Sequence, residues 1–501
     1  MPPIVATVVY SVLILGLFVL GRDRSFRPSK ALWIPVIALL IIGSRPVSVW
    51  LSSLGISQGS QASAAPNQFL DSSPLDGAIS FCLIALTLIV LIARRRRTRI
   101  LLRQNIPILL FFAYCGVSVF WSDYPFVAFK RWVKGVGDLL IVFVILSEAQ
   151  PGPALRKLFS RMSFILVPLS VLLAKYYPDL GRSYNYWTFI PSATGVCTSK
   201  NLLGMLCLVC GLTSLWNAIV VYRDRRAKNR TRQLLAHTII LAMTLWLFSV
   251  ADSVTSLSCF VIGGGLMLVT TTSRIARQPW ALQLLVVSLV ALSSVALFAD
   301  SAGWVIQSLG RDPTLTGRTN IWQVVLSVSG NAWVGTGYES FWTGKRLSAI
   351  WARTMEGLNE AHNGYLEVYL NLGWVGVLLL AGLIVTGYRR VIRAFRRPED
   401  GTVLNLAFFV AALIYNWSEA GFREMSLVWL CFLLAITYAP RRSSSARESS
   451  FSGLGPERRA SHEVGAVGLS IPARSGGDVS DALEQFAGRR ETIVGSQELD
   501  G

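Results

Sequence analysis

Charged residues are scarce in this sequence of 501 residues. They make up 15% of the chain, whereas apolar residues make up 52%, and the mean hydropathy is +0.50. A water-soluble domain cannot hide so much apolar surface, and many apolar runs are long enough to cross about 30 Å of hydrocarbon. The composition therefore excludes a soluble globular protein and predicts an all-α polytopic integral membrane protein.

Several catalytic signatures are also missing. The chain contains no G-x-x-x-x-G-K-[ST] phosphate loop and no H-E-x-x-H zinc helix. Acidic residues in the predicted outer connections are dispersed, and no D-x-D motif there suits a divalent ion. We therefore expect neither a metal ion nor another cofactor.

Acidic residues are few beside basic ones, at 28 against 47, which leaves a net charge of +19. Such a charge can indicate binding to nucleic acid. Here, however, the basic residues lie in short clusters between apolar runs. The charge therefore reflects membrane topology, and we expect no nucleic-acid partner.

The apolar runs predict the membrane-crossing helices. They lie near 3–20, 31–50, 78–93, 106–121, 133–148, 162–177, 200–222, 234–250, 256–272, 282–299, 363–388, 402–418 and 425–439. The last two runs are separated only by Ser418–Glu424, so we expect about 12–14 transmembrane helices.

Clusters of lysine and arginine alternate with poorly basic connections along the chain. Arg94–Arg97 and Arg389–Arg397 are two of these clusters. Because cytoplasmic connections carry the excess of lysine and arginine, these clusters are expected on the cytoplasmic side. The long connection 300–362 then faces outward, and it is polar enough to carry short helices outside the membrane.

The chain divides by composition into a membrane domain, 1–439, and a tail, 440–501. The tail is rich in serine, glycine, arginine and glutamate and has few large apolar residues. Such a segment cannot bury enough apolar surface to fold, so we expect a disordered cytoplasmic tail.

Only three histidines are present, and His362 is the only one expected to face outward. A neutral imidazole with a pKa near 6.5 can take a proton from a hydroxyl at neutral pH. The alternative is an interfacial histidine that binds a lipid headgroup. The H-N-G-Y-L-E motif that begins at His362 favours the catalytic interpretation. In the same motif, Glu367 can orient a neighbour or simply satisfy Asn363.

Arg318 follows Thr316 and Gly317, which indicate the cap and first turn of a short helix. A guanidinium beside a helix N-terminus makes an anion site, because the backbone N–H groups and the helix dipole both favour negative charge there. The alternative is an arginine that only anchors the membrane interface. Positive charge is scarce on the predicted outer side, which favours the anion site.

Three motifs in order carry a family resemblance. They are G-R-T-x-I-W at 317–322, G-x-G-Y-x-S-F-W at 335–342 and H-N-G-Y-L-E-x-x-L-N-L-G-x-x-G at 362–376, with weaker echoes that begin at Lys200 and Asp252. These residues resemble the O-antigen ligase and Wzy-type polysaccharide polymerase superfamily, and within it the exopolysaccharide polymerases of the ExoQ kind. The resemblance places the catalytic region at 182–376.

This resemblance implies polymerisation of undecaprenyl-diphosphate-linked oligosaccharide repeat units into exopolysaccharide, on the periplasmic face of a bacterial inner membrane. The implied chemistry is an inverting glycosyl transfer that needs no metal. The implied partners are the lipid-linked oligosaccharide, membrane lipids, a flippase and chain-length or export proteins. An O-antigen ligase, which transfers the glycan to lipid A-core, is the alternative. A lipid-linked oligosaccharide transporter is a further alternative. The sequence shows no internal repeat, which argues against a transporter.

The resemblance also implies roles for single residues. His362 would be the base or would position the acceptor, and Arg318 would stabilise the leaving diphosphate. Arg182 and Lys200 would help to bind that diphosphate, although Lys200 opens an apolar run and could merely anchor it.

Four further residues, Tyr338, Trp342, Asn363 and Glu367, are the candidates for binding the glycan. Sugar faces stack on aromatic rings, but membrane interfaces are enriched in tryptophan and tyrosine in any case.

Overall fold

The computed structural model describes residues 1–23, 26–56, 73–184, 191–225, 229–272, 278–298, 316–354, 357–395 and 401–437. Met1–Pro440 forms one unit of the chain and Arg441–Gly501 a second. The predicted tail, 440–501, lies outside the described residues, and so does the part of the outer connection between 299 and 315.

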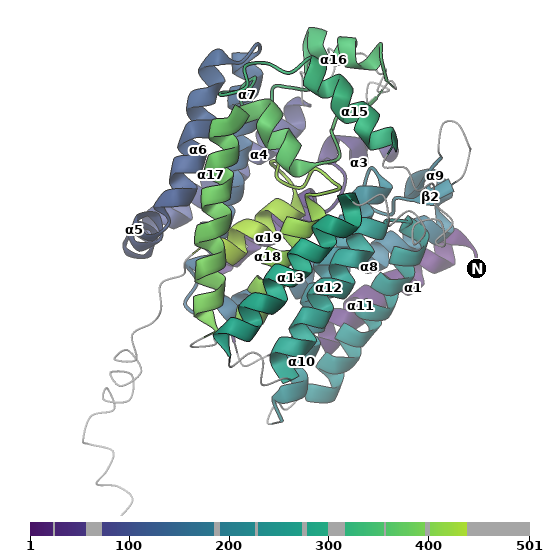
Figure 1. The fold of residues 1–501 in the computed structure, drawn as a ribbon. Coiled ribbons are helices and arrows are strands. Elements are labelled where there is room, and N and C mark those ends of the chain that lie inside the picture. Colours follow the sequence, from purple (N-terminus) through teal and green to yellow (C-terminus); the bar gives the residue numbers. More distant parts are fainter. Residues whose placement is uncertain are drawn as a thin grey trace, which may run out of the picture. The chain divides into compact units, whose positions relative to one another are not determined.

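The described residues are helical apart from one two-stranded sheet and the connections (Figure 1). The helices before the sheet are α1 (Pro3–Leu20), α2 (Trp33–Ile42), α3 (Val47–Ser53), α4 (Pro74–Ala93), α5 (Arg95–Gln104), α6 (Ile106–Val117), α7 (Pro125–Leu146), α8 (Pro151–Tyr176) and α9 (Pro178–Gly181). Those after it are α10 (Lys200–Arg223), α11 (Arg230–Ala251), α12 (Val254–Thr272), α13 (Pro279–Phe298), α15 (Thr316–Ser327), α16 (Gly344–Trp351), α17 (Gly364–Ala394), α18 (Thr402–Tyr415) and α19 (Leu427–Ile436). In the sheet, β1 (Arg182–Tyr184) pairs antiparallel with β2 (Pro191–Ala193). The predicted all-α polytopic membrane class is confirmed.

Seven helices in the described part of the chain are long and apolar enough to cross a membrane. They are α1, α4, α8, α10, α11, α12 and α17. Two bent pairs, α2 with α3 at 58° and α5 with α6 at 83°, raise the number to nine if each pair is one span. This number is lower than the expected 12–14, although every predicted apolar run lies on a helix.

Much of the difference comes from helices that are too short or too charged, and α13 counts only as a shorter apolar helix over Trp280–Ser293. At about 1.5 Å per residue, α18 and α19 are roughly 21 and 15 Å long, well under the hydrocarbon thickness of about 30 Å. Helix α7 has enough length, but it carries Lys130, Arg131, Lys134 and Asp138. Hydropathy locates such buried segments without showing whether they span.

The helices differ sharply in how much of their surface other helices cover. In the most apolar 18-residue stretch of α10, 78% of the stretch is buried, whereas only 11% of the corresponding stretch of α1 is buried. Helix α10 packs against α8, α11 and α12, and every residue of α19 is buried. A helix that is apolar all round belongs in the interior of the bundle, whereas α1 exposes most of its apolar side chains, as expected at a lipid-facing edge.

Helix α17 is broken at Gly373, where φ is +63°. A Cβ at this position would lie 2.3 Å from the backbone of Trp333, so only glycine allows the approach. The connection before α16 uses the break, because Gly337 N–H donates to Asn371 O at 2.9 Å and Trp374 N–H donates to Ala332 O at 2.9 Å. The second motif is thereby hydrogen-bonded to the backbone of the third.

A second, smaller hydrophobic core lies within the outer connection. Its buried members are Val325, Phe341, Trp342, Leu347, Ile350, Trp351, Leu358, Ala361 and Leu370. They come from α15, α16, α17 and the segments between them, and Figure 1 shows these helices close together. The predicted short helices are therefore present, and this core positions the start of α15 beside the start of α17.

Candidate active site

The chain around His362 is held by the start of α17. Asn363 is the N-cap, and its Oδ1 accepts hydrogen bonds from two backbone N–H groups of the first turn, both at 3.0 Å. Gly364 N–H donates to the carbonyls of Asn416 and Glu419, at 2.9 and 3.0 Å. A Cβ on Gly364 would lie 1.8 Å from Asn416 Oδ1. The H-N-G sequence therefore locks His362 against the turn that follows α18.

His362 lies between two carboxylates. Its Nδ1 is 3.1 Å from Glu360 Oε1 and 3.4 Å from Glu419 Oε2. Burial alone would lower the pKa of His362, but the hydrogen bonds and charges of both carboxylates outweigh burial and raise it to about 10. Burial would likewise raise the pKa of Glu360, but His362 and the neighbouring arginines lower it. At neutral pH the imidazole is therefore a cation.

Glu419 connects His362 to Arg318. Arg318 sits in the first turn of α15, and its Nη2 is 3.4 Å from Glu419 Oε1. The other oxygen of this buried carboxylate accepts from Asn201 Nδ2 at 3.1 Å. The starts of α10, α15 and α17 thus converge on one side chain, and the two predicted catalytic residues lie on either side of it.

A second arginine closes the group. Arg423 Nη2 is 3.7 Å from Glu339 Oε2, and its Nη1 is 3.7 Å from Glu360 Oε2. We call Arg318, Glu339, Glu360, His362, Glu419 and Arg423 the outer charge cluster, because the sequence predicts that the connections carrying them face outward. Glu339 and Glu360 were expected to be dispersed, and this expectation was wrong because the folded connection brings them to the same arginine.

Three members of the outer charge cluster could also hold a metal ion. One ligand atom from each of Glu360, His362 and Glu419 lies within 4.8 Å of the others. A histidine with two carboxylates is a ligand set that divalent transition metals accept. The expectation of a metal-free site therefore stays a prediction, which needs an experiment with a chelator.

The described part of the chain resembles known proteins in this same region. Residues 237–381 match the family model of the O-antigen ligases. The predicted resemblance is confirmed. The matched segment runs from α11 into α17 and contains Arg318 and His362.

A known protein matches a longer stretch of this chain. The chain is 22% identical over 324 residues to the exopolysaccharide production protein ExoQ of Rhizobium meliloti (strain 1021). The alignment covers 61% of this chain and 69% of ExoQ. The chain is thus similar both to the O-antigen ligase family model and to an individual exopolysaccharide production protein.

The backbone is strained within the outer charge cluster. Four residues other than glycine have positive φ in the described part of the chain, at Asp252, Glu339, His362 and Met425. Glu339 and His362, with φ of 49°, both belong to the cluster. Such conformations cost on the order of 1–3 kcal/mol and gather at functional sites, so they support a functional role for this region.

The two other predicted diphosphate ligands lie differently. Lys200 opens α10 beside Asn201, and its Nζ is 3.4 Å from Asp252 Oδ2, where both side chains are exposed. Arg182 begins β1, and its Nε donates to Ala174 O at 2.8 Å. Among the described residues, no contact links Arg182 to the outer charge cluster. The structure therefore brings Lys200 close to the cluster through Asn201 but does not bring Arg182 there.

The four predicted glycan ligands are buried. Tyr338 is 7% exposed and Trp342 6%. Trp342 Nε1 donates to both oxygens of Glu367, at 3.0 and 2.9 Å, and Asn363 caps α17. While these contacts hold, no sugar ring can stack on either aromatic face. Their contact with glycan stays a prediction, and the structure shows them holding the loop.

Sequence reasoning missed the residue that holds the second motif. Asn371 Oδ1 accepts from the backbone N–H groups of Ser340 and Phe341, at 2.9 and 3.0 Å, and its Nδ2 donates to Glu367 O. In the sequence, only the position of Asn371 inside the third motif could have indicated this role. Glu419 and Arg423 flank a short predicted outer connection, and from that position they could be expected either to join the cationic residues or only to anchor the turn; the structure places both in the outer charge cluster.

Proposed function

We propose that this protein is a membrane glycosyltransferase that polymerises undecaprenyl-diphosphate-linked repeat units into exopolysaccharide. The O-antigen ligase family match and the similarity to ExoQ support this class. The observation that carries the proposal is the contact of Arg318 and His362 with opposite oxygens of Glu419. These two cations, held around one carboxylate beside a membrane helix, are suited to bind the negative charge of a diphosphate leaving group.

In the proposed reaction, an acceptor hydroxyl attacks the anomeric carbon of the donor sugar. The bond from that carbon to the diphosphate oxygen breaks, and the lipid diphosphate leaves with the electron pair, so one displacement inverts the configuration. Arg318 stabilises the leaving diphosphate, because its fork donates two charge-assisted hydrogen bonds. To do so, Arg318 exchanges the 3.4 Å contact with Glu419 for the phosphate oxygens. Lys200 and Arg182 are the further candidates for this binding.

His362 positions the reactants in this proposal. A protonated imidazole has no lone pair with which to accept a proton, and the pKa near 10 keeps His362 protonated at neutral pH. Its Nδ1 faces the two carboxylates, which leaves Nε2–H to donate to the acceptor or to the diphosphate. The hydroxyl proton then passes to Glu360 or Glu419, the carboxylates nearest to the imidazole.

An O-antigen ligase is the second candidate, because the matching family model bears that description. A ligase uses the same donor chemistry and differs in the molecule that supplies the hydroxyl. The outer charge cluster serves the donor, so it fits both reactions. The similarity to ExoQ over 61% of the chain favours the polymerase.

The deciding experiment supplies the purified protein with a lipid-diphosphate-linked repeat unit as its sole substrate, in the presence of EDTA. A polymerase makes a ladder of products, because donor and acceptor are the same kind of molecule. A ligase leaves the substrate unchanged until lipid A-core is added. A ladder that forms only without EDTA would contradict the metal-free reaction and would assign a metal to Glu360, His362 and Glu419.

We further propose that the outer charge cluster faces the periplasm from a bacterial inner membrane, where a flippase delivers the substrate and export proteins remove the product. The alternation of basic and poorly basic connections supports this orientation. In a Cys82→Ser background, a cysteine placed at the exposed Lys345 should react with an impermeant maleimide from the outside, and one at Arg103 only after permeabilisation. The opposite pattern would overturn the periplasmic assignment.

A further inference from the structure

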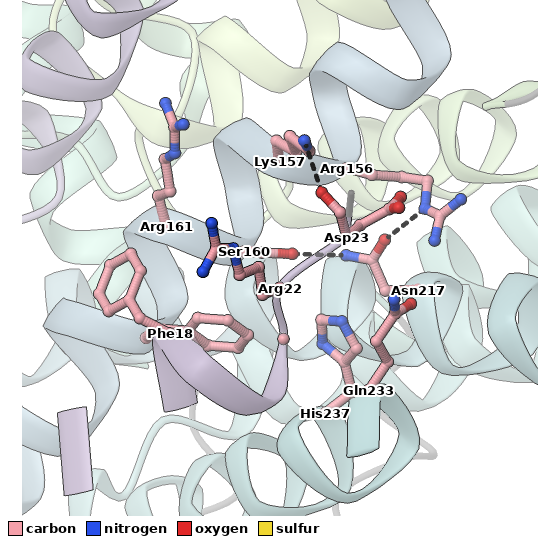
Figure 2. A pocket seen from close by; sticks show the side chains of 12 residues that line it. Phe18, Arg22, Asp23, Arg156, Lys157, Ser160, Arg161, Asn217, Gln233 and His237 are labelled. Atoms are coloured by element: carbon pink, nitrogen blue, oxygen red, sulfur yellow. Dashed lines mark hydrogen bonds between the residues drawn. The ribbon is translucent and has the colours of Figure 1, made fainter. Parts of the chain in front are cut away.

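A cavity of about 160 Å³ lies where the end of α1 meets the start of α8, the end of α10 and the start of α11 (Figure 2). Four cationic side chains line it, and Asp23 is the only acid among the lining residues. The cations are Arg22, Arg156, Lys157 and Arg161. The formal charge of the lining is therefore strongly positive, which suits an anion.

This cavity is separate from the outer charge cluster. Asn201, at the start of α10, contacts Glu419 of the cluster, whereas Asn217, towards the other end of α10, lines the cavity. Sixteen residues of helix separate the two asparagines, which corresponds to roughly 24 Å. The cavity thus lies towards the opposite side of the membrane, the side on which the basic connections are expected.

Three of the cations are held in place by the protein. Arg156 Nε donates to Asn217 Oδ1 at 3.3 Å, and Lys157 Nζ donates to Asp23 O at 3.0 Å. The guanidinium of Arg161 lies 4.4 Å from the ring centroid of Trp33. Figure 2 shows Arg22, Asp23 and Asn217 between the α8 residues on one side and His237 with Gln233 on the other. A ligand would therefore meet cations whose positions are already fixed, which reduces the entropy cost of binding.

His237 provides the independent sign of a ligand. It is 5% exposed, and its Nδ1 has no hydrogen-bond partner within the described residues. The ring packs against Phe164, with centroids 5.6 Å apart, and His237 is among the residues that line the cavity (Figure 2). A buried ring nitrogen without a partner is costly, so a polar atom in the cavity is expected to satisfy it.

We propose that this cavity binds the phosphate group of an anionic ligand. Arginine forks and a lysine are the donors that phosphate oxygens prefer. Helix α1 favours a lipid as the source of the phosphate. Its Phe18 lines the cavity, and its Leu15 and Val19 are each 67% exposed, so an apolar surface for acyl chains lies next to the cavity. A phosphodiester headgroup can then enter the cavity while its acyl chains lie along α1. Free phosphate has the same recognition chemistry, so the experiment separates the two sources.

The test titrates full-length protein in neutral detergent with phosphatidylglycerol and, in a parallel series, with inorganic phosphate, and follows binding by native mass spectrometry. Arg22→Gln is the main variant, because Arg22 is exposed and the change is not expected to disturb folding. Arg103→Gln, an exposed arginine on α5 with the same charge change, is the matched control. His237→Phe removes the unpaired nitrogen and keeps an aromatic ring against Phe164.

Phosphatidylglycerol should bind saturably to the wild type, and Arg22→Gln should weaken that binding about tenfold, the usual effect of losing one charged hydrogen bond. His237→Phe should weaken it as well, and Arg103→Gln should leave it within about twofold of the wild type. Saturable binding of inorganic phosphate that Arg22→Gln weakens would support the phosphate site and assign it to a free anion. The proposal is overturned if neither probe binds saturably, or if Arg22→Gln and Arg103→Gln bind phosphatidylglycerol equally.

Discussion

Glu419→Gln should lower the pKa of His362 by about 1–2 units, because it removes one of the two carboxylates that hold the imidazole charged. Glutamine keeps the shape of the side chain and can still accept from Asn201. The other carboxylate, Glu360 at 3.1 Å, remains, so the pKa should stay above the usual 6.5. The expected order is wild type near 10, then Glu419→Gln, then an unperturbed histidine.

The chain has only three histidines, which makes the measurement direct. Protein labelled with isotopes at histidine shows three sets of imidazole signals by NMR, and His362→Gln identifies the set that belongs to His362. Asp252→Asn is the control, since Asp252 pairs with Lys200 and its loss should leave the pKa of His362 unchanged. A His362 signal that titrates near 6.5 in the wild type would refute the assignment of an imidazolium.

The same pKa predicts how stability depends on pH. The pKa of His362 is higher in the folded state than the usual 6.5 of an unfolded chain, so its contribution is fully present below about pH 6.5 and is lost as pH rises through about 10. Lowering this pKa by two units removes on the order of 3 kcal/mol of stability below pH 6.5. The difference in stability between wild type and Glu419→Gln should therefore be largest below about pH 6.5 and should shrink as pH rises through about 10, above which only the lost contact with Arg318 remains. A constant difference in unfolding temperature across this window would point to lost packing instead.

Two further changes test the leaving-group site and the backbone that supports it. Arg318→Ala and Arg318→Lys should both abolish polymer in cells while the protein level in the membrane remains normal by immunoblot, because lysine lacks the bidentate fork of arginine. Arg346→Lys is the control, since Arg346 forms an ion pair with Asp123. Normal polymer from Arg318→Lys would reduce the role of Arg318 to that of a point charge. Gly335→Ala should lower the unfolding temperature, since φ is +68° and the new Cβ would lie 2.4 Å from the backbone of Asn371. Gly382→Ala, whose new Cβ would meet nothing within 4 Å, should leave the unfolding temperature unchanged. Equal unfolding temperatures for the two variants would show that the outer connection accommodates the extra methyl group.

The class of fold was predictable because hydropathy is a property of single segments. Each expected apolar run is a helix, and the motifs correctly placed short helices in the outer connection. The number of membrane-crossing helices was not predictable from the same signal. Helix α19 is as apolar as a membrane span but only 10 residues long, and it is buried by its neighbours in the bundle.

Part of the candidate site was predictable as well. Arg318 and His362 could be chosen from the sequence because each is a rare residue type for its expected side of the membrane, next to a helix start. Their distance from one another could not be derived, since no spacing rule relates the start of α15 to the start of α17. Glu419 joins them only because Gly364 allows the first turn of α17 to approach the connection after α18.

The sequence by itself therefore determined the membrane class, the helix-forming segments and the family resemblance, which all depend on local composition and on short ordered motifs. Only the tertiary structure decided which charges meet and which aromatic rings are buried. Glu339, Glu360 and Arg423 lie apart along the chain and become neighbours because the second motif is hydrogen-bonded to α17 and the first turn of α17 is hydrogen-bonded to the connection after α18. Trp342 was predicted to contact glycan from a polar loop, but a small hydrophobic core buries it, because an apolar ring gains more free energy against Phe341 and Leu347 than in water.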